Sequence, residues 1–313
     1  MIKTLTLNNG IEMPIFGLGT WLSVKNQAKE AIISAVECGY RLIDNAHVYQ
    51  NEEEIGEALK YLFENNIVKR EDLFIVTKLW NSHHDPEHSF ERCQKTLEKL
   101  QLDYVDLYLV HWPVGYKYDG DNLTPVKEDG TRNFHDYGLE KVWAGMEKIY
   151  ENNLAKSIGV SNFNISQIDL VFGSARIKPA VNQIEVGPSF PNIELIRHCQ
   201  EMGVQIMSYS PLGNPGNSSK NVEKNILEYD HIKNLAQKYN KTPAQICIRF
   251  CLDLKTNCIP KSVTKERIKS NMEVFDFSLT KEEIDEIIEK SPNFRTCNPK
   301  ELMGGSKEFP FFD

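Results

Sequence analysis

Short apolar runs alternate with segments of helical periodicity along most of the chain. The runs are rich in β-branched residues and have the length of buried strands, whereas the intervening segments place apolar residues three and four positions apart. The predicted strands are Ile15–Gly19, Arg41–Asp44, Leu73–Lys78, Val105–His111, Ser157–Ser161, Ala180–Gln183, Gln205–Tyr209 and Asn257–Pro260. The predicted helices span about residues 26–38, 52–65, 87–100, 138–152, 164–173, 191–202, 231–239, 244–254 and 265–274.

This alternation predicts an α/β fold with a parallel sheet and right-handed crossovers. Eight strand–helix units favour a closed (β/α)8 TIM barrel, and a doubly wound open sheet is the competing layout. Before the first unit, Leu5–Ile11 is expected to form a β-hairpin that turns at Asn9-Gly10. Because the sequence shows no interdomain linker, we expect residues 1–313 to form a single domain.

Two connections are unusually long and lack periodicity. Residues 113–137 are rich in Gly, Asp, Asn and Pro, and residues 211–224 contain Gly-Asn-Pro-Gly-Asn-Ser-Ser. Loops of this length are usually functional or disordered. We therefore expect them to contribute to a binding site.

The composition is that of a globular protein, with 41% hydrophobic and 26% charged residues. A net charge of −8 argues against a nucleic-acid groove, which needs clustered Lys and Arg. No apolar run approaches the length of a membrane span, and the first residues do not form a signal peptide. The seven cysteines are scattered without a CxxC motif, which is typical of reduced thiols, so a cytoplasmic protein is expected.

Polar residues occupy the carboxyl ends of the predicted strands, where barrels of this kind build their chemistry. Asp44, Lys78 and His111 end the second, third and fourth strands, and Tyr49 follows the second. Each has a plain structural interpretation on its own, such as a helix cap, a solvated lysine, a core histidine or a rim aromatic. Four such residues at consecutive strand ends favour a common site instead.

These four residue types suit proton delivery to an oxygen that gains negative charge. A phenol is a poor acid at neutral pH, because its pKa is about 10. A nearby Lys78 ammonium is expected to lower the pKa of Tyr49, with Asp44 holding that ammonium charged. A neutral His111 could orient a carbonyl oxygen. No serine or cysteine nucleophile with a base is evident, and His84 and His88 flank a helix entry rather than forming a metal cluster, so no metal is expected.

Several ordered motifs resemble the aldo-keto reductase superfamily from about residue 5 to about residue 300. They are Leu42-Ile-Asp44-Asn-Ala46 with Tyr49 and Asn51-Glu52, Thr77-Lys78-Leu79-Trp80, Leu109-Val-His111-Trp112-Pro113, Lys156-Ser-Ile-Gly-Val-Ser-Asn162-Phe163 and Ile259-Pro-Lys-Ser-Val-Thr264. The chain looks closest to the aldose and aldehyde reductase branch. The resemblance implies an enzyme that reduces sugar or other small aldehydes to primary alcohols with NADPH, working as a monomer.

The resemblance also implies residue roles. The catalytic tetrad would be Asp44, Tyr49, Lys78 and His111, with Tyr49 as the general acid. The NADPH/NADP+ site would contain Gly19, Thr20, Trp21, Asp44, Ser161, Asn162, Gln183, Tyr209, Ser210, Leu212, Lys261, Ser262, Val263, Thr264, Arg267 and Asn271. The carbonyl substrate would contact Trp21, Val48, Trp80, His111, Trp112 and Cys297. The tail, about residues 291–313, would lie over the active site.

The cofactor preference has a separate physical reason. The fork of Arg267 and the ammonium of Lys261 favour the extra phosphate of NADP over NAD. The segment Gly17-Leu-Gly19 begins like a dinucleotide fingerprint but lacks its third glycine, and the family binds its cofactor without a Rossmann fold.

Two departures from the family pattern concern the cofactor. Gly216 stands where an Asp is usual, and Asn217-Ser218-Ser219 replaces an aromatic residue in the loop that closes over the pyrophosphate. We therefore expect a looser clasp, with faster NADP+ release and weaker NADPH affinity. Ser270 replaces a residue that usually contacts adenine. Some members of the family act as cofactor-sensing channel subunits or as structural lens proteins. A cofactor-binding protein with little enzymatic activity is therefore the main alternative function, and a metal-dependent hydrolase is the second.

Overall fold

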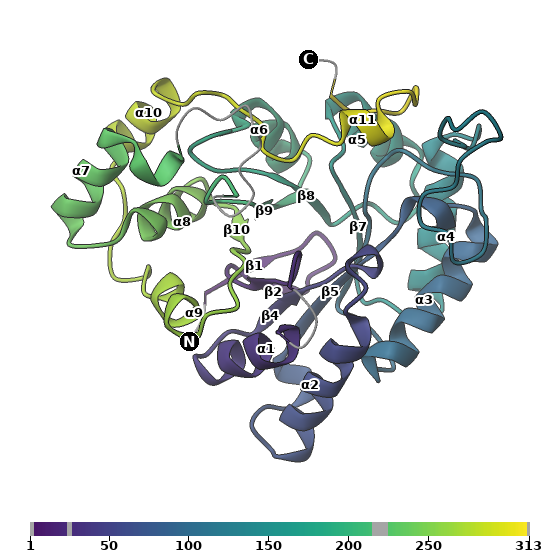
Figure 1. The fold of residues 1–313 in the computed structure, drawn as a ribbon, viewed down its shortest axis with the longest axis horizontal. Helices are drawn as coiled ribbons and strands as arrows, with labels where there is room; N and C mark the ends of the chain where they lie inside the picture. The colour runs from purple at the N-terminus through teal and green to yellow at the C-terminus, as the bar shows by residue number, and fades with distance from the viewer. Residues whose placement is uncertain (1–2, 24–26, 215–224, 312–313) are drawn as a thin grey trace.

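The computed structural model describes residues 3–23, 27–214 and 225–311, and its centre is a sheet of eight parallel strands (Figure 1). Along the sheet the order is β10-β9-β8-β7-β6-β5-β4-β3. The strands are β3 (Leu18–Gly19), β4 (Leu42–Asp44), β5 (Phe74–Leu79), β6 (Leu107–Val110), β7 (Ile158–Ser161), β8 (Val181–Glu185), β9 (Gln205–Tyr209) and β10 (Asn257–Cys258). Each overlaps a strand predicted from the sequence.

The first and last strands meet and close the sheet. Phe16 pairs with Cys258, and Gly19 pairs with Lys261, both in parallel. The backbone N–H of Gly17 donates to the Cys258 carbonyl at 3.0 Å. Every strand therefore has a neighbour on each side, so the prediction of a closed barrel is confirmed and the open doubly wound sheet is excluded.

A hairpin covers the amino-terminal ends of the barrel strands. Strands β1 (Thr4–Thr6) and β2 (Glu12–Pro14) pair antiparallel, and Gly10 has a φ of 84°, which favours glycine in the turn. Asn8 Nδ2 donates to the Pro179 carbonyl at 2.8 Å, just before β8. The predicted hairpin is confirmed, and it closes the end of the barrel that lies away from the predicted site.

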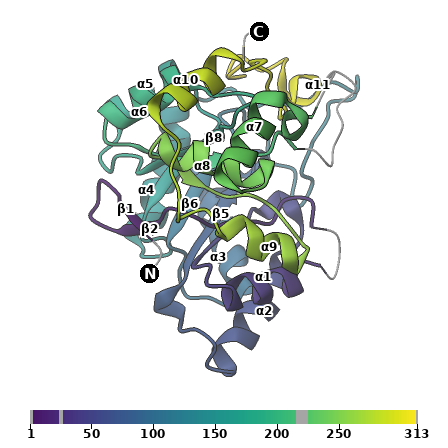
Figure 2. The ribbon, with the colours of Figure 1, turned by 90° about the vertical axis from the view of Figure 1, so that its left-hand side faces the viewer.

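Helices surround the barrel (Figures 1 and 2). They are α1 (Ala28–Glu37), α2 (Glu52–Glu64), α3 (Pro86–Leu100), α4 (Leu139–Glu151), α5 (Ile165–Ser174), α6 (Ile193–Glu201), α7 (Asp230–Tyr239), α8 (Pro243–Asp253) and α9 (Lys265–Met272). Among the described residues, no helix is long and apolar enough to cross a membrane.

Two further helices lie in the carboxyl-terminal part of the chain and were not predicted. They are α10 (Lys281–Glu289) and α11 (Lys300–Met303). Thr280 and Glu283 form a reciprocal capping box at the start of α10. That Thr-x-x-Glu spacing is a recognisable helix-start signal in the sequence.

Apolar side chains form three clusters, of which the third shapes the site. One lies between barrel and helices, and one fills the barrel interior beneath the strand ends. The third covers the carboxyl ends of the strands and joins the 113–137 loop to the tail. It contains Trp80, Trp112, Val114, Tyr116, Met303, Phe309 and Phe311, with Val48, Leu123, Phe134 and Cys297 packed against it.

Candidate active site

The structure brings the four predicted catalytic residues together at the carboxyl ends of the strands. Asp44 ends β4, Lys78 lies near the end of β5, and Tyr49 ends the 3-10 turn His47–Tyr49 that follows β4. Lys78 is fully buried, and its Nζ donates to Asp44 Oδ1 at 2.8 Å and Oδ2 at 2.7 Å. The same Nζ also donates to the Asn45 carbonyl at 2.8 Å and lies 3.4 Å from the Tyr49 hydroxyl.

The expected lowering of the Tyr49 pKa is wrong. Burial raises the pKa of Tyr49 well above its usual value, and the nearby Asp44 carboxylate adds to the rise. Burial also lowers the pKa of Lys78, against the opposing effect of Asp44. The Asp44 charge offsets that of the ammonium, so Tyr49 keeps its proton at neutral pH.

His111 is neutral in this environment, as its predicted role requires. Burial and then the Lys78 charge lower its pKa well below the usual value. Its ring meets the Tyr49 ring edge to face at 5.7 Å and the Trp80 ring at 5.2 Å. His111 Nδ1 is buried without a hydrogen-bond partner within the described ranges, so ring contacts hold the imidazole in place.

Several residues expected to bind the nicotinamide end of a cofactor form one network with the tetrad. Asn162 Nδ2 donates to the His111 carbonyl at 2.9 Å, and Asn162 Oδ1 accepts from the Tyr209 hydroxyl at 2.7 Å. Gln183 Nε2 donates to Asp44 Oδ1 at 2.7 Å, and Ser161 Oγ donates to the Gln183 carbonyl at 2.8 Å. Asn162 has a φ of 63°, a left-handed conformation that asparagine tolerates.

The first barrel strand, β3, with the residue after it and the loop after β9 supply other predicted cofactor residues. Thr20 is buried, and its hydroxyl donates to the Asp44 carbonyl at 2.9 Å. The Gly19 N–H donates to the Pro260 carbonyl, and a Cβ on Gly19 would lie 3.0 Å from the Ile259 carbonyl. After β9, Ser210 and Leu212 are half-buried.

The residues expected to bind the 2′-phosphate lie where β10 leads into α9. Ser262 Oγ accepts from the Thr264 N–H at 3.2 Å, and the N-cap residue Thr264 makes no side-chain hydrogen bond to the first N–H groups of α9. Lys261 Nζ donates to the Leu22 carbonyl at 3.1 Å, while Arg267 is exposed and forms no ion pair with any described residue. Uncapped helix N–H groups beside two cations fit a phosphate. Val263 is half-buried beside them, and Asn271 is buried one helix turn further on.

The predicted substrate contacts are brought together with one exception. Val48, Trp80, Trp112 and Cys297 belong to the apolar cluster at the mouth. Trp80 Nε1 donates to the Leu123 carbonyl at 2.6 Å, which ties the cluster to the 113–137 loop. Trp21 is 36% exposed and lies outside that cluster.

Cys297 is not an activated thiol in this structure. Burial and then the Glu185 charge raise its pKa to about 12. The thiolate is the reactive form of a cysteine. Cys297 is therefore protonated at neutral pH.

Of the two departures from the family pattern, the structure describes only the one on α9. Gly216 and Asn217-Ser218-Ser219 lie outside the described residues, so the looser clasp stays a prediction. Ser270 is half-buried on α9, and its carbonyl accepts from Gln245 Nε2 at 2.9 Å.

His84 and His88 do not face a common ligand. His88 stacks on Tyr118 with 3.6 Å between ring centroids, whereas His84 Nδ1 lies 3.4 Å from His135 Nε2. Asp85, between them, caps α3 by accepting from the Glu87 N–H. No group of three or more His, Cys, Asp or Glu side chains in the described part of the chain could hold a metal ion.

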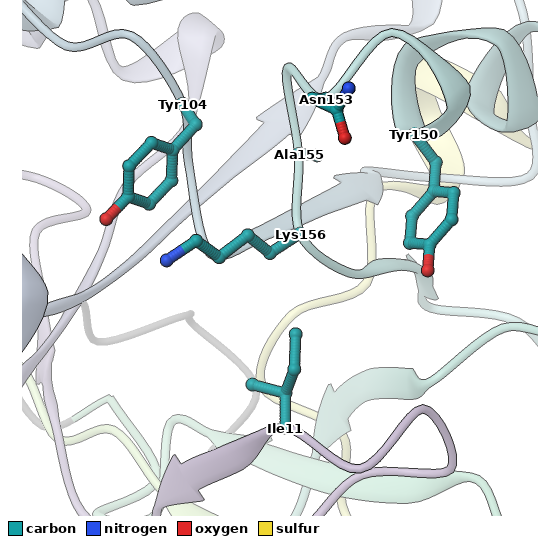
Figure 3. Close-up of a pocket in the computed structure, with 6 residues that line it drawn as sticks. All are labelled: Ile11, Tyr104, Tyr150, Asn153, Ala155 and Lys156. Carbon is teal, nitrogen blue, oxygen red and sulfur yellow. The ribbon is translucent and has the colours of Figure 1, made fainter.

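A separate cavity of about 340 Å³ lies at the amino-terminal side of the barrel, beside the hairpin (Figure 3). Ile11, Tyr104, Tyr150 and Lys156 are among the residues that line it. Lys156 Nζ is already engaged, 3.9 Å from the Tyr104 ring centroid and 3.8 Å from the Asp106 carboxylate. None of the predicted site residues lines this cavity, so the candidate active site is the opposite mouth.

The comparisons with known proteins agree with this geometry. The sequence profile of the aldo/keto reductase family matches residues 15–292. The chain belongs to the aldo/keto reductase family. The fold has close counterparts among solved structures of the family. An aldose reductase from Schistosoma japonicum superposes with a TM-score of 0.93 at 42% identity, covering 100% of this chain and 99% of that one.

Two other family members match over nearly their whole length. Aldo-keto reductase family 1 member A1 of Gallus gallus is 46% identical, covering 99% of this chain and 97% of the relative. A Bombyx mori aldo-keto reductase solved in complex with NADP has a TM-score of 0.91 at 35% identity, covering 99% of each chain. The chain is therefore an oxidoreductase of this family.

Proposed function

We propose that the protein reduces small aldehydes to primary alcohols with NADPH, using Tyr49 as the proton donor. The observation that carries the proposal is the buried Lys78 ammonium, which contacts the Asp44 carboxylate and lies 3.4 Å from the Tyr49 hydroxyl. The neutral His111 ring meets the Tyr49 ring edge to face, with 5.7 Å between the ring centroids. These groups suit proton delivery to the oxygen of a carbonyl group that is being reduced.

NADPH is the proposed cofactor because this chain's residues fit it and a relative carries NADP. Ser161, Asn162 and Gln183 would hold the carboxamide of the nicotinamide, with Tyr209 against the ring. Lys261, Arg267 and the uncapped start of α9 would hold the 2′-phosphate. When bound, the dihydronicotinamide would supply a hydride to the carbonyl carbon.

The chain's own residues would manage the oxygen and its proton. His111 would hydrogen-bond the carbonyl oxygen and orient it toward Tyr49. As negative charge develops on that oxygen, Tyr49 would transfer its hydroxyl proton to it, because an alkoxide is a stronger base than a phenolate. Lys78 would stabilise the phenolate left behind, and Asp44 would hold Lys78 in position.

The apolar cluster at the mouth would exclude water and select the substrate. Trp80, Trp112, Val48 and Cys297 would contact an aliphatic or aromatic aldehyde, with Trp21 at the rim. We further propose that residues 1–313 act as one domain with the tail from about residue 291 over the site, as a cytoplasmic monomer. The packing of Phe309 and Phe311 against Trp112 supports the position of the tail.

NADPH consumption with a simple aromatic aldehyde tests the proposal. Tyr49→Phe should lower turnover by about 10²- to 10⁴-fold, the usual contribution of a general acid, while NADPH binding persists. Tyr239→Phe is the matched control, because the Tyr239 hydroxyl donates to Glu283 Oε2 at 2.7 Å, away from the residues proposed to bind cofactor and substrate. The preference for NADPH should appear when NADH replaces it.

Two outcomes would contradict the proposal. Equal loss of turnover in both tyrosine variants would make the effect structural. Tight NADPH binding by the wild-type protein without reduction of any aldehyde or sugar would favour a cofactor-sensing role.

A further inference from the structure

The tail is fastened to the barrel by one buried carboxylate. Glu185 lies at the carboxyl end of β8 and is 1% exposed. Its Oε1 accepts from the Thr296 N–H at 2.7 Å and from the Thr296 hydroxyl at 2.6 Å. Its Oε2 accepts from the Cys297 N–H at 2.8 Å. Both carboxylate oxygens are therefore used to hold two consecutive tail residues.

The residues held in this way reach both halves of the candidate site. Cys297 packs into the apolar cluster with Trp80 and Trp112. Cys297 also lies close enough to the Tyr209 side chain to influence its charge state, and the Tyr209 hydroxyl donates to Asn162 Oδ1 at 2.7 Å. The position of Cys297 is thus linked to residues expected to contact substrate and nicotinamide.

The residue before Thr296 strengthens the same attachment. The guanidinium of Arg295 lies 4.1 Å from the Phe190 ring centroid and 3.6 Å from the Phe311 ring centroid. Phe190 belongs to the loop after β8, whereas Phe311 is the last described residue. Arg295 therefore ties the far end of the tail to the loop beside Glu185.

We propose that Glu185 is a positioning residue that sets aldehyde selectivity by holding Thr296 and Cys297 against the mouth. The proposal rests on the proposed aldehyde reduction and adds a residue outside the tetrad. Aldehydes with a bulky ring would contact the side of the pocket formed by Thr296 and Cys297, so their binding would depend on Glu185. A three-carbon aldehyde would react at the tetrad without reaching Thr296 or Cys297.

Amide hydrogen exchange tests the attachment itself without any turnover. In Glu185→Gln one acceptor oxygen becomes an NH2 group that cannot accept from the tail. Exchange at Thr296 and Cys297 should become at least about tenfold faster, as expected for loss of one hydrogen bond to a charged group. Thr296→Val removes only the hydroxyl contact and should give a smaller increase.

Glu147→Gln is a matched control. Glu147 is also buried, and its Oε1 accepts from the Arg176 N–H at 2.7 Å and the Ile177 N–H at 3.0 Å, far from the tail. Glu147→Gln should accelerate amide hydrogen exchange at residues 176–177 and leave exchange at Thr296 and Cys297 unchanged. Unchanged tail exchange in Glu185→Gln, or equal tail exchange in both variants, would overturn the attachment.

Steady-state kinetics with glyceraldehyde and 4-nitrobenzaldehyde test selectivity. Glu185→Gln should raise KM for the aromatic aldehyde by up to about tenfold, because the tail residues that contact it are held less firmly, with kcat and the glyceraldehyde constants little changed. Equal changes for both aldehydes, or none, would overturn the selectivity role. If the wild-type protein reduces neither aldehyde, the proposed function and the selectivity role fail together, and the exchange result still decides the attachment.

Discussion

Replacing Asp44 by Asn is the sharpest test of the buried pair beneath Tyr49. The substitution keeps the size of the side chain but removes the charge that faces Lys78 Nζ at 2.7 Å. Lys78 has no exposure to solvent, so the ammonium would remain without a compensating charge. The same change weakens the contact between Gln183 Nε2 and Asp44 Oδ1.

The expected loss of stability follows from the burial. Removing one partner of a buried ion pair costs about 3–5 kcal/mol, because the other charge stays desolvated. Unfolding entropy is about 2.1 cal/mol/K per residue, so for 313 residues Tm should fall by about 5–8 °C.

The loss of stability in Asp44→Asn should also depend on pH. Burial already lowers the pKa of Lys78, and losing Asp44 lowers it further below the unfolded value of about 10.4. Between these two pKa values the unfolded variant binds more protons than the folded one, so its stability rises with pH. The gap in Tm should therefore narrow from pH 7 toward pH 10.

Thermal unfolding followed by circular dichroism, with turnover measured on the same samples, checks this reasoning. Asp106→Asn is the control, because Asp106 is buried and forms an ion pair at 2.8 Å with the half-buried Arg70, at the opposite end of the barrel. It should lower Tm without lowering turnover, whereas Asp44→Asn should lower both. An Asp44→Asn protein with wild-type Tm, or with a Tm deficit independent of pH, would refute the account of the pair.

Two further predictions concern the 113–137 loop and the response to acid. In Gly115→Ala the new Cβ would lie 1.5 Å from His135 Nε2. Such overpacking should lower the free energy of unfolding by about 1–3 kcal/mol in urea titrations. Adding His135→Ala should restore stability, and a double variant as unstable as Gly115→Ala would show that the clash with His135 is not the cause. Burial lowers the pKa of His83 to about 3. Since unfolded histidine titrates near 6.5, stability should fall below that pH by about 1.4 kcal/mol per pH unit from this residue. In His83→Gln the slope should be smaller by that amount, and an unchanged slope would contradict the assignment.

Much of the site could be predicted because a parallel barrel gathers its strand ends. Asp44, Lys78 and His111 are far apart in the sequence, but each follows a recognisable apolar run. Once the runs are assigned as parallel strands, their ends must converge on one mouth. The pairing of Asp44 with Lys78 then follows from charge alone, and the structure shows it.

Features that depend on tertiary burial could not be predicted in the same way. The pKa of Tyr49 shifts upward because burial outweighs the charge of Lys78. No local sequence pattern reveals how deeply a side chain will be buried. Glu185 stands at a strand end in the sequence, but its partners Thr296 and Cys297 lie more than 100 positions away. Helix α10 was missed although its capping box was present in the sequence.

The pairing of the first and last strands has a consequence for synthesis of the protein. Gly17 and Cys258 are about 240 positions apart, so their contact has one of the longest loops the chain can close. A ribosome adds about 5–20 residues per second, so roughly 13–50 s pass before residue 261 is made. Until then the nascent chain carries two open sheet edges, and association with chaperones is expected during that interval.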